Sequence, residues 1–118
     1  MAHHAGLEPF LPDAWEEYLR CFSDPAAIHA SCEDYRAAAS IDLKHDAESI
    51  AAERKVLCPL LALWRAHGVV GWLFKPLAEW RKVATDVHGK ALPCGHYIPE
   101  EAPELLVNEL LDFFKGGF

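Results

Sequence analysis

The chain has 118 residues, which is one domain or part of one. Its 18 acidic residues against 11 Lys and Arg give a net charge of −7, which argues against a nucleic-acid partner because phosphate binding needs clustered cations. Apolar residues make up 52% of the chain, but no run approaches the roughly 20 residues of a membrane span, so we expect no membrane partner.

The N-terminus has neither the basic start nor the apolar stretch of a signal peptide. The four cysteines are Cys21, Cys32, Cys58 and Cys94, and no two of them have Cys-x-x-Cys spacing. Reduced thiols in a cytoplasm are the simplest interpretation. No second ligand pair with finger-like spacing accompanies Cys94 and His96, so we predict no metal site.

The first half of the chain predicts three helices. The first begins near Pro12 and carries an apolar stripe that we expect to be buried, formed by Trp15, Tyr18, Leu19 and Phe22. The second is opened by the cap Ser23-Asp24-Pro25 and runs to about Ala39, with one face formed by Ile28, Cys32, Tyr35 and Ala39. The third, 41–54, is polar, and its inward residues are Leu43 and Ile50.

The second half predicts two strands and two helices. Residues 56–64 are almost all apolar, which is typical of a parallel strand buried on both faces. A loop at 65–71 follows, and then a helix at 76–84 with inward residues Leu77, Trp80 and Val83. A shorter strand spans 87–92. The closing helix runs from about 100 to 115 and is ended by Gly116-Gly117.

This order places the chain in the α/β class, with a boundary near Lys55. A strand-helix-strand unit makes two parallel neighbours, but two parallel strands leave faces and edges that need cover. The three leading helices do not alternate with strands and are interpreted as part of a helical cap. We therefore expect a partial cap at 1–54 and a β-α-β-α portion of a core at 55–118.

Gly95-His96 follows the second strand and precedes a Pro-bounded turn and the closing helix. A histidine at the exit of a strand is well placed to act as a general base, and we favour that role over a solvated loop histidine. Glu100 and Glu101 are assigned to the first turn of the closing helix, where carboxylates suit the helix dipole.

Other candidates favour structural interpretations. Cys94 lies two residues from His96, but strand spacing alone gives no base-to-sulfur geometry, so we do not expect a nucleophile there. His67 lies in the loop after the first strand, where an exposed histidine is the commoner case. Core packing is favoured for Trp64, Trp72 and Trp80, and a surface position without partners for His29, His45 and His88.

Several segments resemble the haloacetate dehalogenases, a family of α/β-hydrolases that includes the fluoroacetate-hydrolysing enzymes. They are YLRCFSDP at 18–25, EDYRA at 33–37, IDLKHD at 41–46, CPLLALW at 58–64 and GHYIPEEAP at 95–103. The resemblance covers about Leu7 to Phe114, and the cap segment around Tyr35 is its most specific part. It implies the C-terminal part of an α/β-hydrolase fold, namely a partial cap, the last two strands and the last two helices.

In that family an Asp displaces halide and forms an ester, a His draws a proton from water to hydrolyse the ester, and a second Asp orients the His. The resemblance implies that His96 is the base and that Tyr35 is the cap tyrosine that helps to hold the departing halide. It implies no metal or organic cofactor and a small halogenated carboxylate as substrate. The nucleophile, the orienting acid and the carboxylate-binding arginines belong to upstream segments that this sequence does not contain. One departure is Arg65, where the family usually has Gly after Trp64.

Two interpretations follow. In the first, the chain supplies His96 and Tyr35 to a haloacetate dehalogenase-type hydrolase and is inactive without the nucleophile. In the second, it is a non-enzymatic interaction module, or a truncated remnant, that self-associates into a homo-oligomer through exposed strand edges and helix faces.

Overall fold

A computed structural model describes residues 6–66 and 68–116 of the chain. The predictions for the extreme N-terminus, His67 and Gly117 fall outside these ranges. Contacts divide the chain into a helical unit, Phe10–Lys55, and a unit that contains both strands, Val56–Phe118 with Met1–Pro9. None of the described helices is long and apolar enough to cross a membrane.

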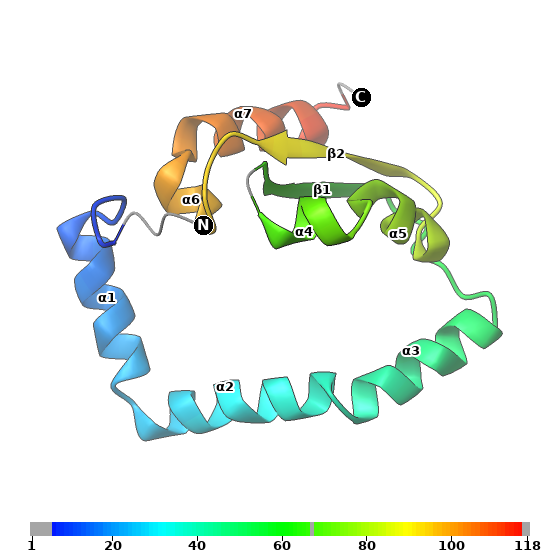
Figure 1. The fold of residues 1–118 in the computed structure, drawn as a ribbon, viewed down its shortest axis with the longest axis horizontal. Coiled ribbons are helices and arrows are strands. Elements are labelled where there is room, and N and C mark those ends of the chain that lie inside the picture. The colour runs from blue at the N-terminus through cyan, green and yellow to red at the C-terminus, as the bar shows by residue number, and fades with distance from the viewer. Residues whose placement is uncertain (1–5, 67, 117–118) are drawn as a thin grey trace. The chain divides into compact units, whose positions relative to one another are not determined.

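The helical unit consists of α1 (Pro12–Phe22), α2 (Pro25–Ala38) and α3 (Ile41–Ala51) (Figure 1). The three predicted helices are confirmed, and proline at the first position opens two of them. The Asp24 side chain accepts a hydrogen bond from the backbone N–H of Ala26 at 2.8 Å, as expected of an N-cap. The third helix ends before the predicted limit, and Glu53 beyond it has a positive φ of 52°.

The predicted burial of this unit is wrong, because no residue of α1, α2 or α3 is buried. Phe10 packs edge-to-face on two aromatic rings of α1, with centroid distances of 5.6 Å to Trp15 and 6.0 Å to Tyr18. The other apolar residues that the pattern placed inward stay exposed: Leu19, Phe22, Ile28, Leu43 and Ile50. Helical periodicity predicts which side chains share a face, but a face is buried only where another element packs on it.

The second unit is built on the parallel strands β1 (Leu60–Arg65) and β2 (Val87–Leu92). Their register pairs Leu60 with Val87 and Arg65 with Leu92, and a further parallel bridge joins Val56 to Ala84. Two adjacent parallel strands confirm the central prediction for the fold. The first strand is shorter than predicted and is half-buried rather than buried, because each of its faces has only partial cover.

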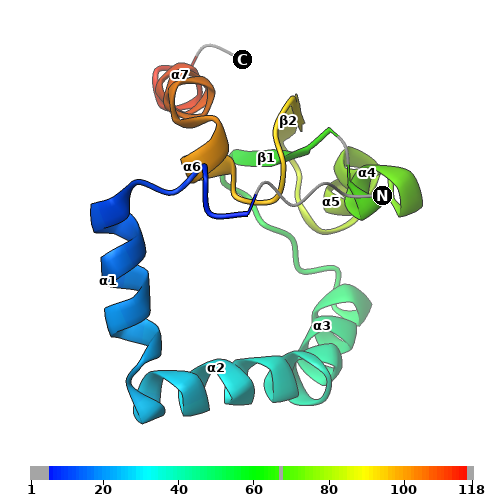
Figure 2. The ribbon, with the colours of Figure 1, turned by 60° about the vertical axis from the view of Figure 1, so that its left-hand side comes forward.

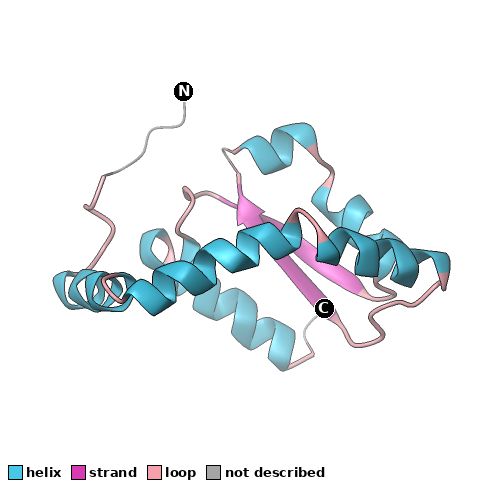
Figure 3. Ribbon diagram, turned by 90° about the horizontal axis from the view of Figure 1, so that it is seen from below, coloured by secondary structure: helices cyan, strands magenta, loops and turns pink. Residues whose placement is uncertain are grey.

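The strands are joined by α4 (Val69–Leu73) and α5 (Pro76–Val83), and β2 is followed by α6 (Ile98–Glu101) and α7 (Pro103–Phe114). Figure 2 shows α4 and α5 on one side of the strand pair and α6 and α7 on the other, and Figure 3 marks the two strands in magenta. The short α4 lies where the sequence predicted a loop. The single predicted closing helix is divided in two at Ala102, because Pro103 disfavours helical geometry in the residue before it.

The core of the described residues is small. Only Ala84, Val87 and Leu92 are buried, and they lie on or next to β2. Trp72 and Trp80 are exposed, Trp72 to 91%, so the prediction that both pack in a core is wrong. The carboxyl end of β2 is therefore anchored by Leu92, and the chain turns from this buried residue into the loop that carries His96.

Candidate active site

His96 lies in the loop that joins the carboxyl end of β2 to α6. In open parallel sheets ligands bind at the edge formed by the carboxyl ends of the strands, and His96 follows such an end. The side chain is exposed, and its ring packs edge-to-face on Tyr97 with centroids 5.0 Å apart. No carboxylate within residues 6–66 and 68–116 forms an ion pair with His96.

The backbone on both sides of His96 is bound by one carboxylate. Glu101 accepts hydrogen bonds from the N–H of Gly95 at 2.5 Å and from the N–H of Tyr97 at 3.0 Å. Glu100 and Glu101 lie in the first turn of a helix as predicted, although this helix is the short α6 rather than α7, and Glu101 binds the loop as well. The pattern GHYIPEEAP places a carboxylate five residues after the histidine, but only the turn geometry brings the two together.

Cys94 is disfavoured as a nucleophile by its surroundings. Burial raises the pKa of its thiol, and the negative charge of Glu101 raises that pKa further. Both effects favour the neutral thiol, whereas attack requires the thiolate. The structure therefore agrees with the structural interpretation of this residue.

Tyr35 lies on α2 in the helical unit, with 80% of its surface exposed. The side chain is therefore accessible to a small ligand. Its role as a cap residue stays a prediction. His29 is exposed near Glu33 on the same helix, with 3.9 Å between Nε2 and Oε1, and His45 is exposed on α3.

The prediction for His88 is wrong. Its side chain is about two-thirds buried, and its Nε2 atom lies 2.7 Å from Oδ1 of Asp86. His88 belongs to β2 and follows Asp86 by two residues, a spacing that places two side chains on the same face where the backbone is extended.

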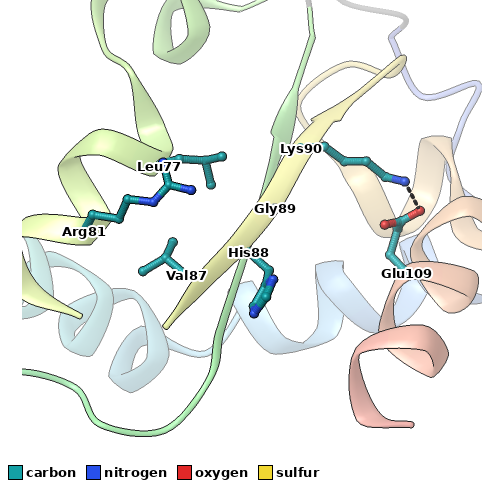
Figure 4. A pocket seen from close by; sticks show the side chains of 7 residues that line it. All are labelled: Leu77, Arg81, Val87, His88, Gly89, Lys90 and Glu109. Atoms are coloured by element: carbon teal, nitrogen blue, oxygen red, sulfur yellow. Dashed lines mark ion pairs between the residues drawn. The ribbon is translucent and has the colours of Figure 1, made fainter. Parts of the chain in front are cut away.

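A hollow of about 270 Å³ follows the first half of β2 (Figure 4). In its wall the ammonium group of Lys90 pairs with Oε1 of Glu109 on α7 at 2.7 Å. The residues that line the hollow are Leu77, Arg81, Val87, His88, Gly89, Lys90 and Glu109. They come before the carboxyl end of the strand, whereas His96 comes after it, so this hollow is separate from the predicted site. No group of three or more metal-ligating side chains occurs among the described residues.

No family model matches the chain. Over 112 residues, or 95% of its length, the chain is 34% identical to the fluoroacetate dehalogenase of a Burkholderia species. Over 100 residues it is 34% identical to the soluble epoxide hydrolase of Corynebacterium sp. strain C12. The matches cover 36% and 32% of those proteins, so the chain spans about a third of the length of these curated relatives.

A solved structure from Nostoc sp. PCC 7120, described as an α/β-hydrolase, matches 91% of this chain with a TM-score of 0.85 and 51% identity. The chain covers 36% of that structure. The fold of this chain is that of the α/β-hydrolases. The chain corresponds to a C-terminal portion of that fold, and its predicted resemblance to the haloacetate dehalogenase family is confirmed.

The likeness to α/β-hydrolase structures accounts for the fold described above. The helices with a two-stranded parallel sheet are the C-terminal part of a larger architecture. The two curated relatives are a dehalogenase and an epoxide hydrolase, so both support a hydrolase resemblance while their names give different reactions.

Proposed function

We propose that this α/β-hydrolase chain supplies the base and a halide-binding cap residue to a dehalogenase that acts on small halogenated carboxylates. The observation that carries the proposal is the position of His96 immediately beyond the carboxyl end of β2, in a strand pair that runs parallel. The 34% identity to a fluoroacetate dehalogenase over 95% of the chain supports the choice of reaction.

The proposed reaction has two steps. A carboxylate oxygen of an Asp attacks the carbon that bears the halogen, so a carbon–oxygen bond forms while the carbon–halogen bond breaks and halide leaves with the electron pair. Water then attacks the ester carbonyl, and His96 takes the proton from that water. The ester carbon–oxygen bond then breaks, and the departing alkoxide takes the proton from His96 to become the hydroxy acid, while the new carboxyl group of the Asp loses its proton to solvent and is again a carboxylate.

The nucleophile, the orienting acid and the groups that bind the substrate carboxylate are assigned to segments of the fold that lie outside the matched third of the relatives. Tyr35 is assigned to the departing halide, because a phenolic hydroxyl is a hydrogen-bond donor and its exposure leaves it accessible. The 118-residue chain is therefore expected to show no turnover alone, since the covalent route requires an activated nucleophile.

Complementation tests this proposal. The 118-residue chain is mixed with the part of the Burkholderia fluoroacetate dehalogenase that lies outside the matched segment, and fluoride release from fluoroacetate is recorded. We expect release from the mixture and from neither part alone. His96→Asn should abolish turnover, Tyr35→Phe should reduce it, and the exposed control His45→Asn should leave it unchanged. A correctly assembled mixture that releases no fluoride would overturn the proposal.

A second candidate function is self-association as an interaction module. The observation that favours it is the apolar surface of the short α4 helix and the residue after it, where Val69, Trp72, Leu73 and Phe74 are all exposed. Contiguous exposed apolar side chains mark interaction surfaces. Sedimentation of the purified chain separates the two candidates, because a module of this kind forms a discrete oligomer that Trp72→Lys disrupts, whereas a stable monomer excludes it.

A further inference from the structure

The loop that carries His96 is tied to α6 by one carboxylate. The side chain of Glu101 spans the loop, with Oε2 bound to the N–H of Gly95 at 2.5 Å and Oε1 bound to the N–H of Tyr97 at 3.0 Å. These two amides are the ones that immediately precede and follow His96. Each is a hydrogen bond to an ionised acceptor, which is stronger than one between neutral groups.

Backbone hydrogen bonds also join this loop to α6. The carbonyl oxygen of Tyr97 accepts hydrogen bonds from the N–H of Glu100 at 3.0 Å and from that of Glu101 at 2.8 Å. The loop and the helix are therefore joined in both directions, by side chain to backbone and by backbone to backbone. At the other end of the loop, the N–H of Cys94 donates to the carbonyl of Leu92 at 2.8 Å, and Leu92 is buried.

Gly95, the residue before His96, leaves room for this contact because it has no side chain. A Cβ atom placed on Gly95 would lie 2.4 Å from Oε2 and 2.6 Å from Oε1 of Glu101. Both distances are too short for any real contact, so a side chain at position 95 would displace the carboxylate. Glycine before the histidine thus leaves the space that Glu101 occupies.

We propose that Glu101 is the positioning residue of His96: its carboxylate binds the amides on both sides of the histidine and so fixes the direction in which the imidazole leaves the sheet edge. The consequence for catalysis rests on the proposed function of His96 as the base. The hydrogen bonds from the loop to Glu101 do not depend on that proposed function, and they can be measured in the 118-residue chain alone. Precise placement matters because a general base has to lie within hydrogen-bond reach of the proton that it takes.

Amide hydrogen exchange in the 118-residue chain tests the contact directly. Glu101→Ala should raise the exchange rates of Gly95 and Tyr97 about tenfold, since it removes a charge-assisted acceptor from each. Glu104→Ala, which removes a carboxylate from the exposed first turn of α7, should leave both rates unchanged. Glu101→Gln keeps one acceptor oxygen and should restore protection to one of the two amides.

Exchange that stays the same in Glu101→Ala would overturn the proposal. So would an equal rise at all amides of β1 and β2, because that would indicate general loosening of the unit. In the complemented enzyme, Glu101→Ala should lower kcat for halide release at least tenfold with little change in KM, and Glu101→Gln should recover part of the loss. If the wild-type mixture releases no halide, the proposed function fails while the exchange result still decides the role of Glu101.

Discussion

Gly89 lies directly opposite Ala62 in the parallel strand pair, and a Cβ atom on Gly89 would be 1.9 Å from the carbonyl oxygen of Ala62. The backbone of Gly89 also has a φ of 149°, which is rare for residues with a side chain. The two strands can therefore approach as closely as they do only because position 89 is glycine. The placement of every residue after β2, His96 included, depends on this close approach.

Gly89→Ala should separate the strands and destabilise the chain by at least about 2 kcal/mol, because the obstructing atom belongs to the backbone and cannot rotate away. Chemical denaturation followed by circular dichroism measures the change. Gly71→Ala is the matched control, since its added methyl group would meet Trp64 at an ordinary 3.6 Å. Helical alanine at position 71 should be neutral or stabilising, by up to about 1 kcal/mol. Equal stability of the two variants would show that the strands do not need glycine at position 89.

The parallel strand pair was predictable because its signal is local. An apolar run ending at Trp64 and a short strand at 87–92, separated by a helical segment, leave few arrangements other than parallel neighbours. The same argument failed for α4, whose Val69 and Val70 are poor helix formers beside two glycines. Whether such a short helix forms is decided by contacts within the folded unit, and those contacts leave no periodic pattern of apolar residues in the sequence.

Burial and the support of His96 were not predictable for a related reason. Helical spacing marks which face of α1 is apolar, but whether Leu19 and Phe22 are covered depends on surfaces that the pattern does not contain. The position of His96 followed from its place after a strand. The role of Glu101 required knowing that α6 ends before Ala102 and turns its last carboxylate back onto the loop.

The ion pair between Lys90 on β2 and Glu109 on α7 should contribute to the stability of the strand unit. Only 12% of the Glu109 side chain is exposed, so removal of its partner leaves a carboxylate largely shielded from water. Lys90→Met keeps the apolar stem and removes the ammonium group, and we expect a loss of about 1–3 kcal/mol in the free energy of unfolding. Lys82→Met breaks the exposed pair with Glu79 and should cost no more than about 0.5 kcal/mol. Similar losses in both variants would show that the Lys90 pair behaves as an ordinary surface pair.

Cys94 should react slowly with alkylating reagents near neutral pH. Burial and the charge of Glu101 raise the pKa of its thiol, so the reactive thiolate forms only at higher pH than in an ordinary cysteine. Glu101→Gln removes the repulsive charge and should lower the pKa, which moves the pH profile of alkylation to lower values. The rate is measured in a variant that retains Cys94 and has serine at the other three positions. A profile that does not move, or that moves to higher pH, would contradict the assigned cause.

The role of His96 as the base is tested most directly by the stoichiometry of halide release in the complemented enzyme. In His96→Asn the first step, attack on the carbon that bears the halogen, needs no base, whereas hydrolysis of the ester does. We therefore predict a burst of about one halide per site followed by arrest, with the ester detectable by mass spectrometry as an added acid on the nucleophilic Asp. Continuous turnover of His96→Asn at the wild-type rate would contradict the assignment of His96 as the base.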